Sequence, residues 1–175
     1  MDNNYIFQYW EAIQNGTVTV GKWIKTIYEI LVNGLKSGKW DFDEEKANKA
    51  INFIENFCHH SEGRNDLLKL ELWQKAIVSA IFGIMDKRTG YRQFREVFIV
   101  VARKNGKTLF AAAIAAYMAY IDGEYGAKVY FLAPKLDQAE LVYDAFYQIV
   151  QADDELDSIT TVSYTHLTLP TTSRV

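Results

Sequence analysis

The residues with the clearest chemical potential are Gly106, Lys107 and Thr108, which end a polar turn and precede an alanine-rich run. A glycine, a lysine and a hydroxyl at a strand-to-helix turn are the parts of a phosphate-binding loop. Backbone N–H groups and the positive end of the following helix can surround a triphosphate. Lys107 can neutralise its β and γ phosphates, and the Thr108 hydroxyl can ligate Mg²⁺. The spacing therefore predicts a nucleotide site, with an ordinary helix start as the alternative.

The segments around this turn predict an α/β fold. We expect a strand at 96–101, a helix at about 107–121, a second strand at 128–133 and an amphipathic helix at about 136–151. A strand–helix–strand unit of this length predicts parallel strands joined by a right-handed crossover. The near-continuous apolar run of the first strand indicates burial on both faces. The fold class is therefore a P-loop NTPase-type βαβ core.

The chain before residue 90 is predicted to be helical. Apolar residues recur at close to a 3.6-residue period in Val20–Leu35. Asp41 and Asp43 are candidate caps for a second helix that runs to about His59. A third helix has one apolar side, formed by Leu72, Ala76, Ile77, Ala80, Ile81 and Ile84.

The composition of the chain limits the kinds of site and location that it can have. Of the 175 residues 49% are hydrophobic and 23% charged, the net charge is −3, and Cys58 is the single cysteine. An internal disulfide is thereby excluded, and no apolar run has the length of a membrane span. Cys58-His59-His60 is a poor zinc site because adjacent residues make poor co-ligands. Asp153-Asp154-Glu155 follows a helical pattern rather than a buried strand, which argues against catalytic carboxylates.

The turn Ala102–Thr108 resembles the variant Walker A motif of the large terminase subunit of tailed phages. That family often lacks the first glycine of the motif, which agrees with Val101, and begins the loop with an arginine, here Arg103. Three further segments are similar to the family: Phe42–Glu55, Leu70–Lys75 with Ile81–Gly83, and Asp122–Ala127. The resemblance covers roughly residues 5–158.

The resemblance implies roles for the residues of the turn. Arg103 and Lys107 would be catalytic, with Arg103 as an arginine finger acting in cis, and Thr108 would hold Mg²⁺. Lys104, Asn105 and Gly106 would bind ATP together with these residues. Gln74 would read the adenine edge, since an amide both donates and accepts, with Trp73 nearby.

The whole protein implied by the resemblance is a homo-oligomeric ring on the portal protein in the host cell cytoplasm. It works with a small terminase subunit, and ATP hydrolysis drives double-stranded DNA into the capsid. We expect a helical lead-in at 1–66, a partial ATPase core at 67–161 and a tail at 162–175 that resembles a translated sequencing adapter. Without a Walker B strand or the nuclease domain of the family, the chain is predicted not to turn over ATP. The alternatives are a helicase-like translocase and a non-catalytic binding or scaffold module.

Overall fold

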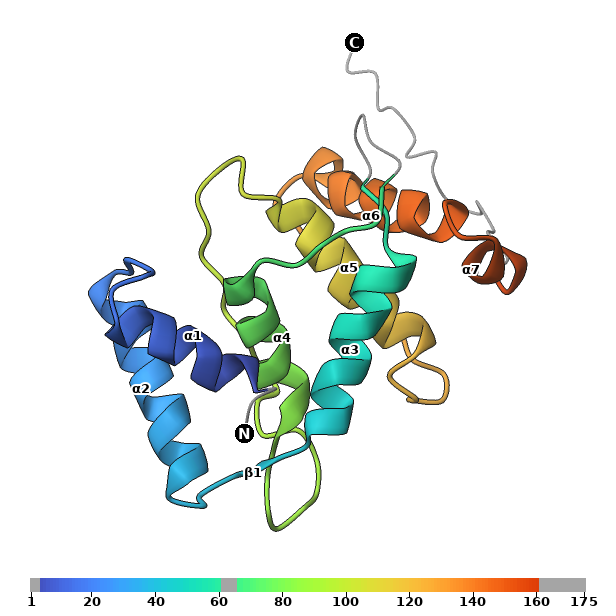
Figure 1. The fold of residues 1–175 in the computed structure, drawn as a ribbon. Helices are drawn as coiled ribbons and strands as arrows, with labels where there is room; N and C mark the ends of the chain where they lie inside the picture. Colours follow the sequence, from blue (N-terminus) through green and yellow to red (C-terminus); the bar gives the residue numbers. More distant parts are fainter. Residues whose placement is uncertain (1–3, 61–65, 161–175) are drawn as a thin grey trace.

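The computed structural model describes residues 4–60 and 66–160, so the predicted tail at 162–175 lies outside the described residues. Helices dominate the described part, and they pack around α4 at its centre (Figure 1). The elements in chain order are α1 (Tyr5–Gln14), α2 (Lys22–Lys36), β1 (Asp41–Phe42), α3 (Glu44–Phe57), α4 (Leu72–Gly83), β2 (Ile84–Met85), α5 (Lys107–Tyr120), α6 (Leu136–Gln151) and α7 (Asp154–Ser158).

Short polar side chains set the start of several helices. The Asn4 side chain accepts the Ile6 N–H before α1, and Asp43 accepts the Lys46 N–H before α3. Each bond satisfies an N–H group that lacks an intrahelical acceptor. Of the two predicted caps, Asp43 is therefore confirmed, while Asp41 lies in β1.

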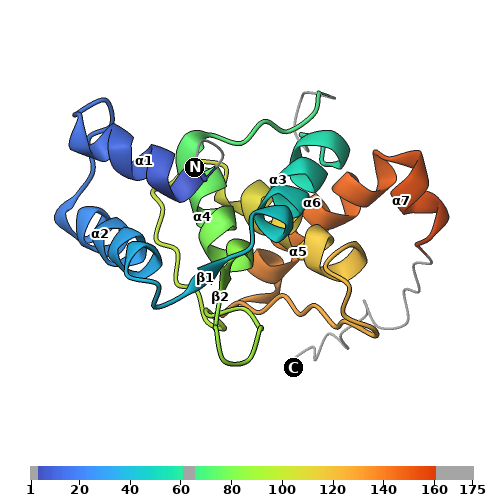
Figure 2. The same cartoon turned by 60° about the horizontal axis from the view of Figure 1, so that its bottom comes forward.

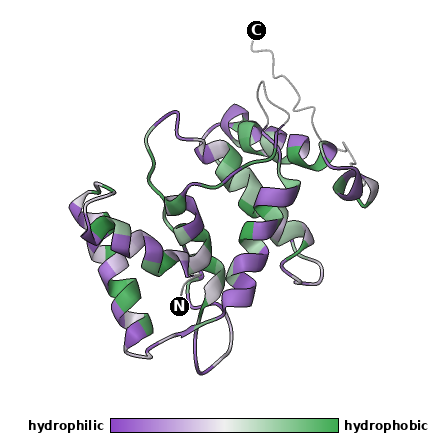
Figure 3. Ribbon diagram, in the orientation of Figure 1, coloured by the Kyte–Doolittle hydropathy of each residue, from purple (hydrophilic) through white to green (hydrophobic). Residues whose placement is uncertain are grey.

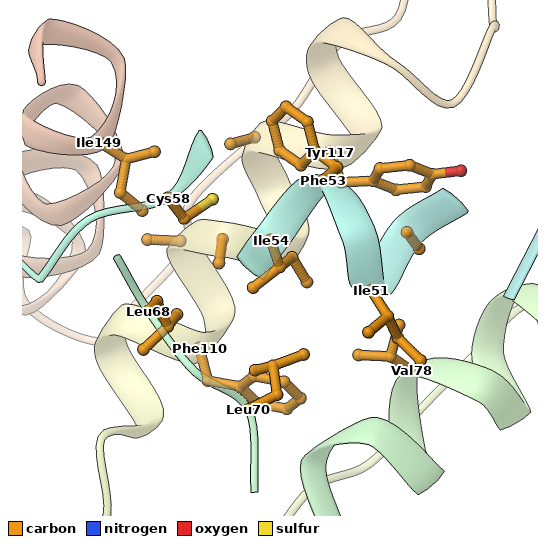
Figure 4. Close-up of a cluster of buried hydrophobic side chains, with 14 of the residues drawn as sticks. Ile51, Phe53, Ile54, Cys58, Leu68, Leu70, Val78, Phe110, Tyr117 and Ile149 are labelled. Atoms are coloured by element: carbon orange, nitrogen blue, oxygen red, sulfur yellow. The ribbon is translucent and has the colours of Figure 1, made fainter. Parts of the chain in front are cut away.

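The larger hydrophobic core joins α3, α4, α5 and α6. Figure 4 shows side chains from these helices meeting the chain that runs from Leu68 to Leu70. Phe82 of α4 meets Tyr117 of α5 edge to face, with ring centroids 4.8 Å apart. Small side chains on the buried side of α5, such as Ala113 and Ala116, let the helices approach closely. On α3, Ala47, Ile51 and Ile54 are buried and Phe57 is partly buried, and Cys58 just after the helix is also buried.

A second core lies between α1, α2 and α4. Tyr9 of α1 meets Tyr28 of α2 with ring centroids 4.7 Å apart. Ile6, Leu31, Val32 and Ala76 complete its buried centre. Because α4 contributes to both cores, it is buried on more sides than the single apolar side predicted from the sequence: Val78, Ser79 and Phe82 are also fully buried.

The predicted parallel strands are not formed in this structure. The sheet of the described chain has two short strands, β1 and β2, which pair antiparallel with Phe42 opposite Ile84 (Figure 2). Residues 96–101 and 128–133 are extended, yet within 4–60 and 66–160 their backbones make no backbone–backbone hydrogen bond. A strand requires a neighbour about 4.8 Å away, and no such partner lies beside either segment in the described chain.

Side-chain exposure in the two extended segments still follows a strand period. Phe98 and Val100 are 92% and 79% exposed, whereas Val97 and Ile99 between them are 48% and 39% exposed. In the second segment Leu132 is exposed, while Phe131 packs against Phe146 of α6. Alternation with a period of two is typical of a strand with one covered face. The side chains of each segment thus alternate in exposure as those of a strand do, although neither segment has a ladder partner in the described residues.

Candidate nucleotide site

The turn before α5 has an unusual backbone at two positions. Lys104 has φ 66° and Gly106 has φ 63°, both in the left-handed region. A Cβ added at Gly106 would meet no atom within 4 Å, so glycine is favoured here by its backbone conformation rather than by lack of space. The Asn105 side chain donates to the carbonyl oxygens of Ala102 and Arg103, each at 3.3 Å, and thereby closes the turn on itself.

The first turn of α5 is open to an anion. Gly106 is its N-cap and provides no side-chain bond. The first backbone bond of the helix runs from the Phe110 N–H to the Gly106 oxygen at 2.9 Å. The N–H groups of Lys107, Thr108 and Leu109 precede that bond and have no intrahelical acceptor. Together with the helix dipole they favour a negative ligand at this position.

A large open cleft of about 1310 Å³ begins at this turn. Arg103, Lys107 and Thr108 of the turn line it, as does Trp73 of α4. Other lining residues come from both extended segments, with Val97, Ile99, Val101, Leu132 and Ala133, from α5 and α6, and from the loops that contain Arg92, Arg95 and Glu124. The predicted phosphate residues therefore open into a space that a nucleotide can enter.

The basic side chains between 86 and 108 divide into paired and unpaired groups. Arg92 pairs with Asp122 at 2.9 Å, and Lys87 pairs with Asp41 at 3.4 Å. Among the ion pairs of the described residues, none involves Arg103, Lys104 or Lys107. The cations of the turn are thus available to a ligand.

Gln74 lies in a different environment from the rest of the predicted site. It is 7% exposed, and its Oε1 accepts the Glu71 N–H at 2.9 Å as half of a capping box at the start of α4. It is not among the residues that line the cleft, whereas its neighbour Trp73 is. The structure therefore brings Arg103, Lys107 and Thr108 together and leaves Gln74 outside the wall that they form.

Two groups that the sequence analysis argued against as sites do not line the cleft. Asp153 is the N-cap of α7 and accepts the N–H groups of Glu155 and Leu156 at 3.0 Å each. The acids at 153–155 therefore come directly after the end of α6 and begin another short helix. Cys58 is fully buried in the larger core, and its carbonyl oxygen accepts the Leu68 N–H at 2.7 Å.

Glu124 is a candidate that the sequence analysis did not single out. It is an exposed acid in the loop after α5, and it lines the cleft together with Arg92 and Arg95. The sequence signal was limited to its position between Gly123 and Gly126, both of which have positive φ. Only the tertiary fold brings this loop to the cleft.

Comparison with known proteins identifies the family. A sequence model described as "Terminase large subunit, ATPase domain" matches residues 72–165, more than half of the chain. The chain belongs to the terminase large subunit family. The family match includes the turn and the cleft-lining residues of α5, and so confirms the resemblance on which their predicted roles depend.

A solved terminase structure supports the same assignment. The crystal structure of the HK97 bacteriophage large terminase is similar at a TM-score of 0.58 and 25% sequence identity, over 69% of this chain and 24% of that chain. The present terminase chain thus spans about a quarter of the length of the HK97 protein. No curated protein matches the chain. No helix of the described ranges combines the length and apolarity that crossing a membrane requires.

Proposed function

We propose that this chain is the ATP-binding part of a phage DNA-packaging motor, with the triphosphate held at the turn 102–108. The observation that carries the proposal is the open start of α5. Three backbone N–H groups without intrahelical acceptors lie beside Lys107, Arg103 and Thr108 at the mouth of the cleft. A dense negative charge is the ligand that this arrangement favours.

Each residue of the turn has a distinct role in this proposal. Lys107 neutralises the β and γ phosphates, and Arg103 contacts the γ phosphate, where charge develops during transfer. Thr108 supplies its hydroxyl to Mg²⁺, which is consistent with its half-buried position on the cleft wall. Lys104, Asn105 and Gly106 act through the main chain, because the positive φ at Lys104 and Gly106 shapes the loop.

The adenine contact is assigned to Trp73, which lines the cleft, and to Gln74, whose side chain would have to turn towards the cleft. Gln74 Oε1 already accepts the Glu71 N–H, so we assign the contact with the base to its Nε2 donor. Trp73 packs on Phe110 of α5 with ring centroids 5.9 Å apart, so it links the base side of the site to the helix that binds phosphate.

The sheet of the ATPase core is proposed to be completed outside this chain. The extended segments 96–101 and 128–133 alternate in exposure as strands do, and their backbones lack ladder partners in the described residues. We assign them as parallel strands of a βαβ unit whose neighbours come from the rest of the terminase, of which this chain spans only part. In this assignment 1–66 is a helical lead-in and 67–161 is the first part of the core.

In the complete protein, we propose that ATP hydrolysis moves double-stranded DNA through the portal protein into the capsid. A ring of subunits in the host cytoplasm would do this with a small terminase subunit, and a nuclease domain would cut the DNA. Asp153 caps α7 and the two following acids lie in its first turn, so we propose that none of them is a Walker B carboxylate. The chain alone should therefore bind Mg-ATP without steady-state turnover.

The proposal is tested by thermal melting of this chain with and without Mg-ATP. Binding to the native state raises the melting temperature, and Lys107→Ala should abolish the rise. Lys25→Ala is the control, because that lysine is exposed on α2, does not line the cleft and makes no ion pair in the described structure. A steady-state ATPase assay should give background rates for all three proteins.

Three outcomes would contradict the proposal. An unchanged melting temperature in Mg-ATP, with the fold intact by circular dichroism, would favour a non-catalytic module. A nucleotide-induced rise that survives Lys107→Ala would place binding elsewhere. A turnover rate above background that Lys107→Ala removes would show that the chain carries its own catalytic carboxylate.

A further inference from the structure

Glu55 of α3 uses both of its carboxylate oxygens. Hydrophilic and hydrophobic residues lie close together on this helix (Figure 3), and Glu55 directly follows the buried Ile54. Its Oε1 accepts the Leu70 N–H, and its Oε2 accepts a hydrogen bond from the Lys75 ammonium, each at 3.0 Å. The Glu55 and Lys75 side chains are 17% and 20% exposed, so water screens this pair less than it screens a surface pair. One side chain of α3 therefore holds two points of the chain around the start of α4.

These two points lie on either side of the residues where α4 begins. Leu70 directly precedes the N-cap residue Glu71, and Lys75 is in the first turn of the helix. In the described chain the Leu70 N–H has no backbone acceptor, so the carboxylate of Glu55 takes the place of one. The next amide, that of Glu71, donates to the Gln74 side chain. Two consecutive N–H groups at the entry to α4 are thus held by side chains, and the one from another helix is Glu55.

Trp73 links this part of α4 to the nucleotide cleft. Its ring packs on Phe110 of α5 with centroids 5.9 Å apart, and it lines the cleft. Phe110 is buried, and its N–H donates to the Gly106 oxygen in the turn at 102–108, at 2.9 Å. A change in where α4 begins would therefore shift Trp73 relative to this turn, and Gln74 with it.

We propose that Glu55 is a positioning residue for recognition of the adenine base. By holding Leu70 it fixes where α4 begins, and so it sets the direction in which Trp73 and Gln74 face. The inference rests on the adenine contact proposed above. Glu55 does not line the cleft, so it acts on the nucleotide only through the residues that it holds. The phosphate contacts are the same for ATP and GTP, so the ratio of the two affinities isolates the contact with the base.

Three variants separate the two hydrogen bonds of Glu55. In Glu55→Gln a single amide oxygen meets two donors, and the charged Lys75 ammonium attracts it more strongly than the Leu70 N–H does. The Leu70 N–H then faces the amide nitrogen, which is itself a donor. Lys75→Met removes only the ion pair and keeps the bond to Leu70. In the double variant Glu55→Gln/Lys75→Met the ammonium is absent, so the amide oxygen can accept the Leu70 N–H again.

Calorimetric titration of this chain with Mg-ATP and with Mg-GTP measures the base preference. We expect the unaltered chain to bind ATP more tightly than GTP. Glu55→Gln should weaken ATP binding roughly tenfold, the equivalent of one hydrogen bond, and GTP binding less than about twofold. Lys75→Met and the double variant should keep the preference of the unaltered chain. Because the double variant lacks the ion pair altogether, a role of Glu55 in stability alone would instead give it the lowest preference.

The possible outcomes separate this inference from the proposed function. Binding of neither nucleotide by the unaltered chain would overturn the proposed function and the inference together. Equal affinity of the unaltered chain for ATP and GTP would overturn the adenine contact, and the inference with it, but not the triphosphate site. An ATP preference that survives Glu55→Gln, that Lys75→Met lowers equally, or that the double variant fails to restore would overturn the positioning role of Glu55 alone.

Discussion

The guanidinium of Arg92 and the carboxylate of Asp122 meet at 2.9 Å and tie the loop after β2 to the end of α5. Arg92 also lies over the Phe82 ring, 5.3 Å from its centroid. The two side chains are 29% and 15% exposed, so water screens the pair less than a surface pair. Helix α5 is thereby fixed at the end opposite to the turn at 102–108.

Asp122→Asn should destabilise the chain by about 1–2 kcal/mol, between the values typical of exposed and of buried pairs. The substitution leaves the Arg92 guanidinium partly buried without its counter-ion. Urea unfolding measures the change. The matched control is Asp41→Asn, which breaks the more exposed pair with Lys87 and should cost less than about 0.5 kcal/mol. Equal losses of unfolding free energy from the two substitutions would show that the Arg92–Asp122 pair stabilises the chain no more than the exposed pair does.

Gly83→Ala should destabilise the chain by about 1–3 kcal/mol through overpacking. A Cβ at this position would lie 2.6 Å from Cε2 of Phe42 and 2.9 Å from Cβ of Ala47, at the junction of α4 with β2. Gly21→Ala is the control, because no atom lies within 4 Å of its added Cβ. Thermal melting of both variants gives the comparison, and a Gly83→Ala variant as stable as Gly21→Ala would contradict the tight packing of this junction.

The Cys58 thiol should resist modification in the folded chain. Burial, and secondarily the charge of Asp153, raises the pKa of Cys58 to about 12. Only about one thiol in ten thousand would then be thiolate at pH 8, and the thiolate is the reactive form. Ellman's reagent should label Cys58 slowly in buffer and rapidly in 8 M urea, about the concentration that unfolds most small domains. Rapid labelling without urea would mean that the larger core opens readily.

Alkaline pH should destabilise the chain through Tyr117. Burial, and then the charge of Asp122, raises the pKa of Tyr117 to about 12 from its usual value of 10.0. The folded state thus retains the phenol proton that the unfolded state loses first. This contribution is complete below pH 10 and declines as pH rises towards 12. Tyr117→Phe should flatten the fall in unfolding free energy across that interval, and an unchanged slope would refute the assignment to this residue.

Local signals predicted much of the helical part. Gly106 and Lys107 mark the start of α5, the period from Leu136 gives α6 with its observed ends, and Asp43 caps α3 as expected. These features depend on residues close in sequence. The lead-in was predicted to be helical as a whole, but the bounds of α1 were not given, although Asn4 caps it and Ile6, Tyr9 and Ile13 follow a helical period.

The features that were missed depend on distant contacts. The β1–β2 pair joins residues more than forty positions apart, Asp41 with Met85. The strands expected at 96–101 and 128–133 had the right apolar pattern, but a pattern cannot supply a ladder partner. Gln74 was assigned to the adenine from the family resemblance, supported by the hydrogen-bonding capacity of its amide. The structure shows that the Oε1 of Gln74 accepts the Glu71 N–H at the start of α4, the helix that contains Gln74.

Helix α4 has Ala76 in the core shared with α1 and α2, and Val78 and Phe82 in the core shared with α3 and α5. Removal of the first 66 residues would expose α4 both on the side that packs against α1 and α2 and on the side that packs against α3. The lead-in and the ATPase segment are therefore a single cooperative unit, which should melt in one transition, and a nucleotide bound at the turn would stabilise residues as remote as Tyr9.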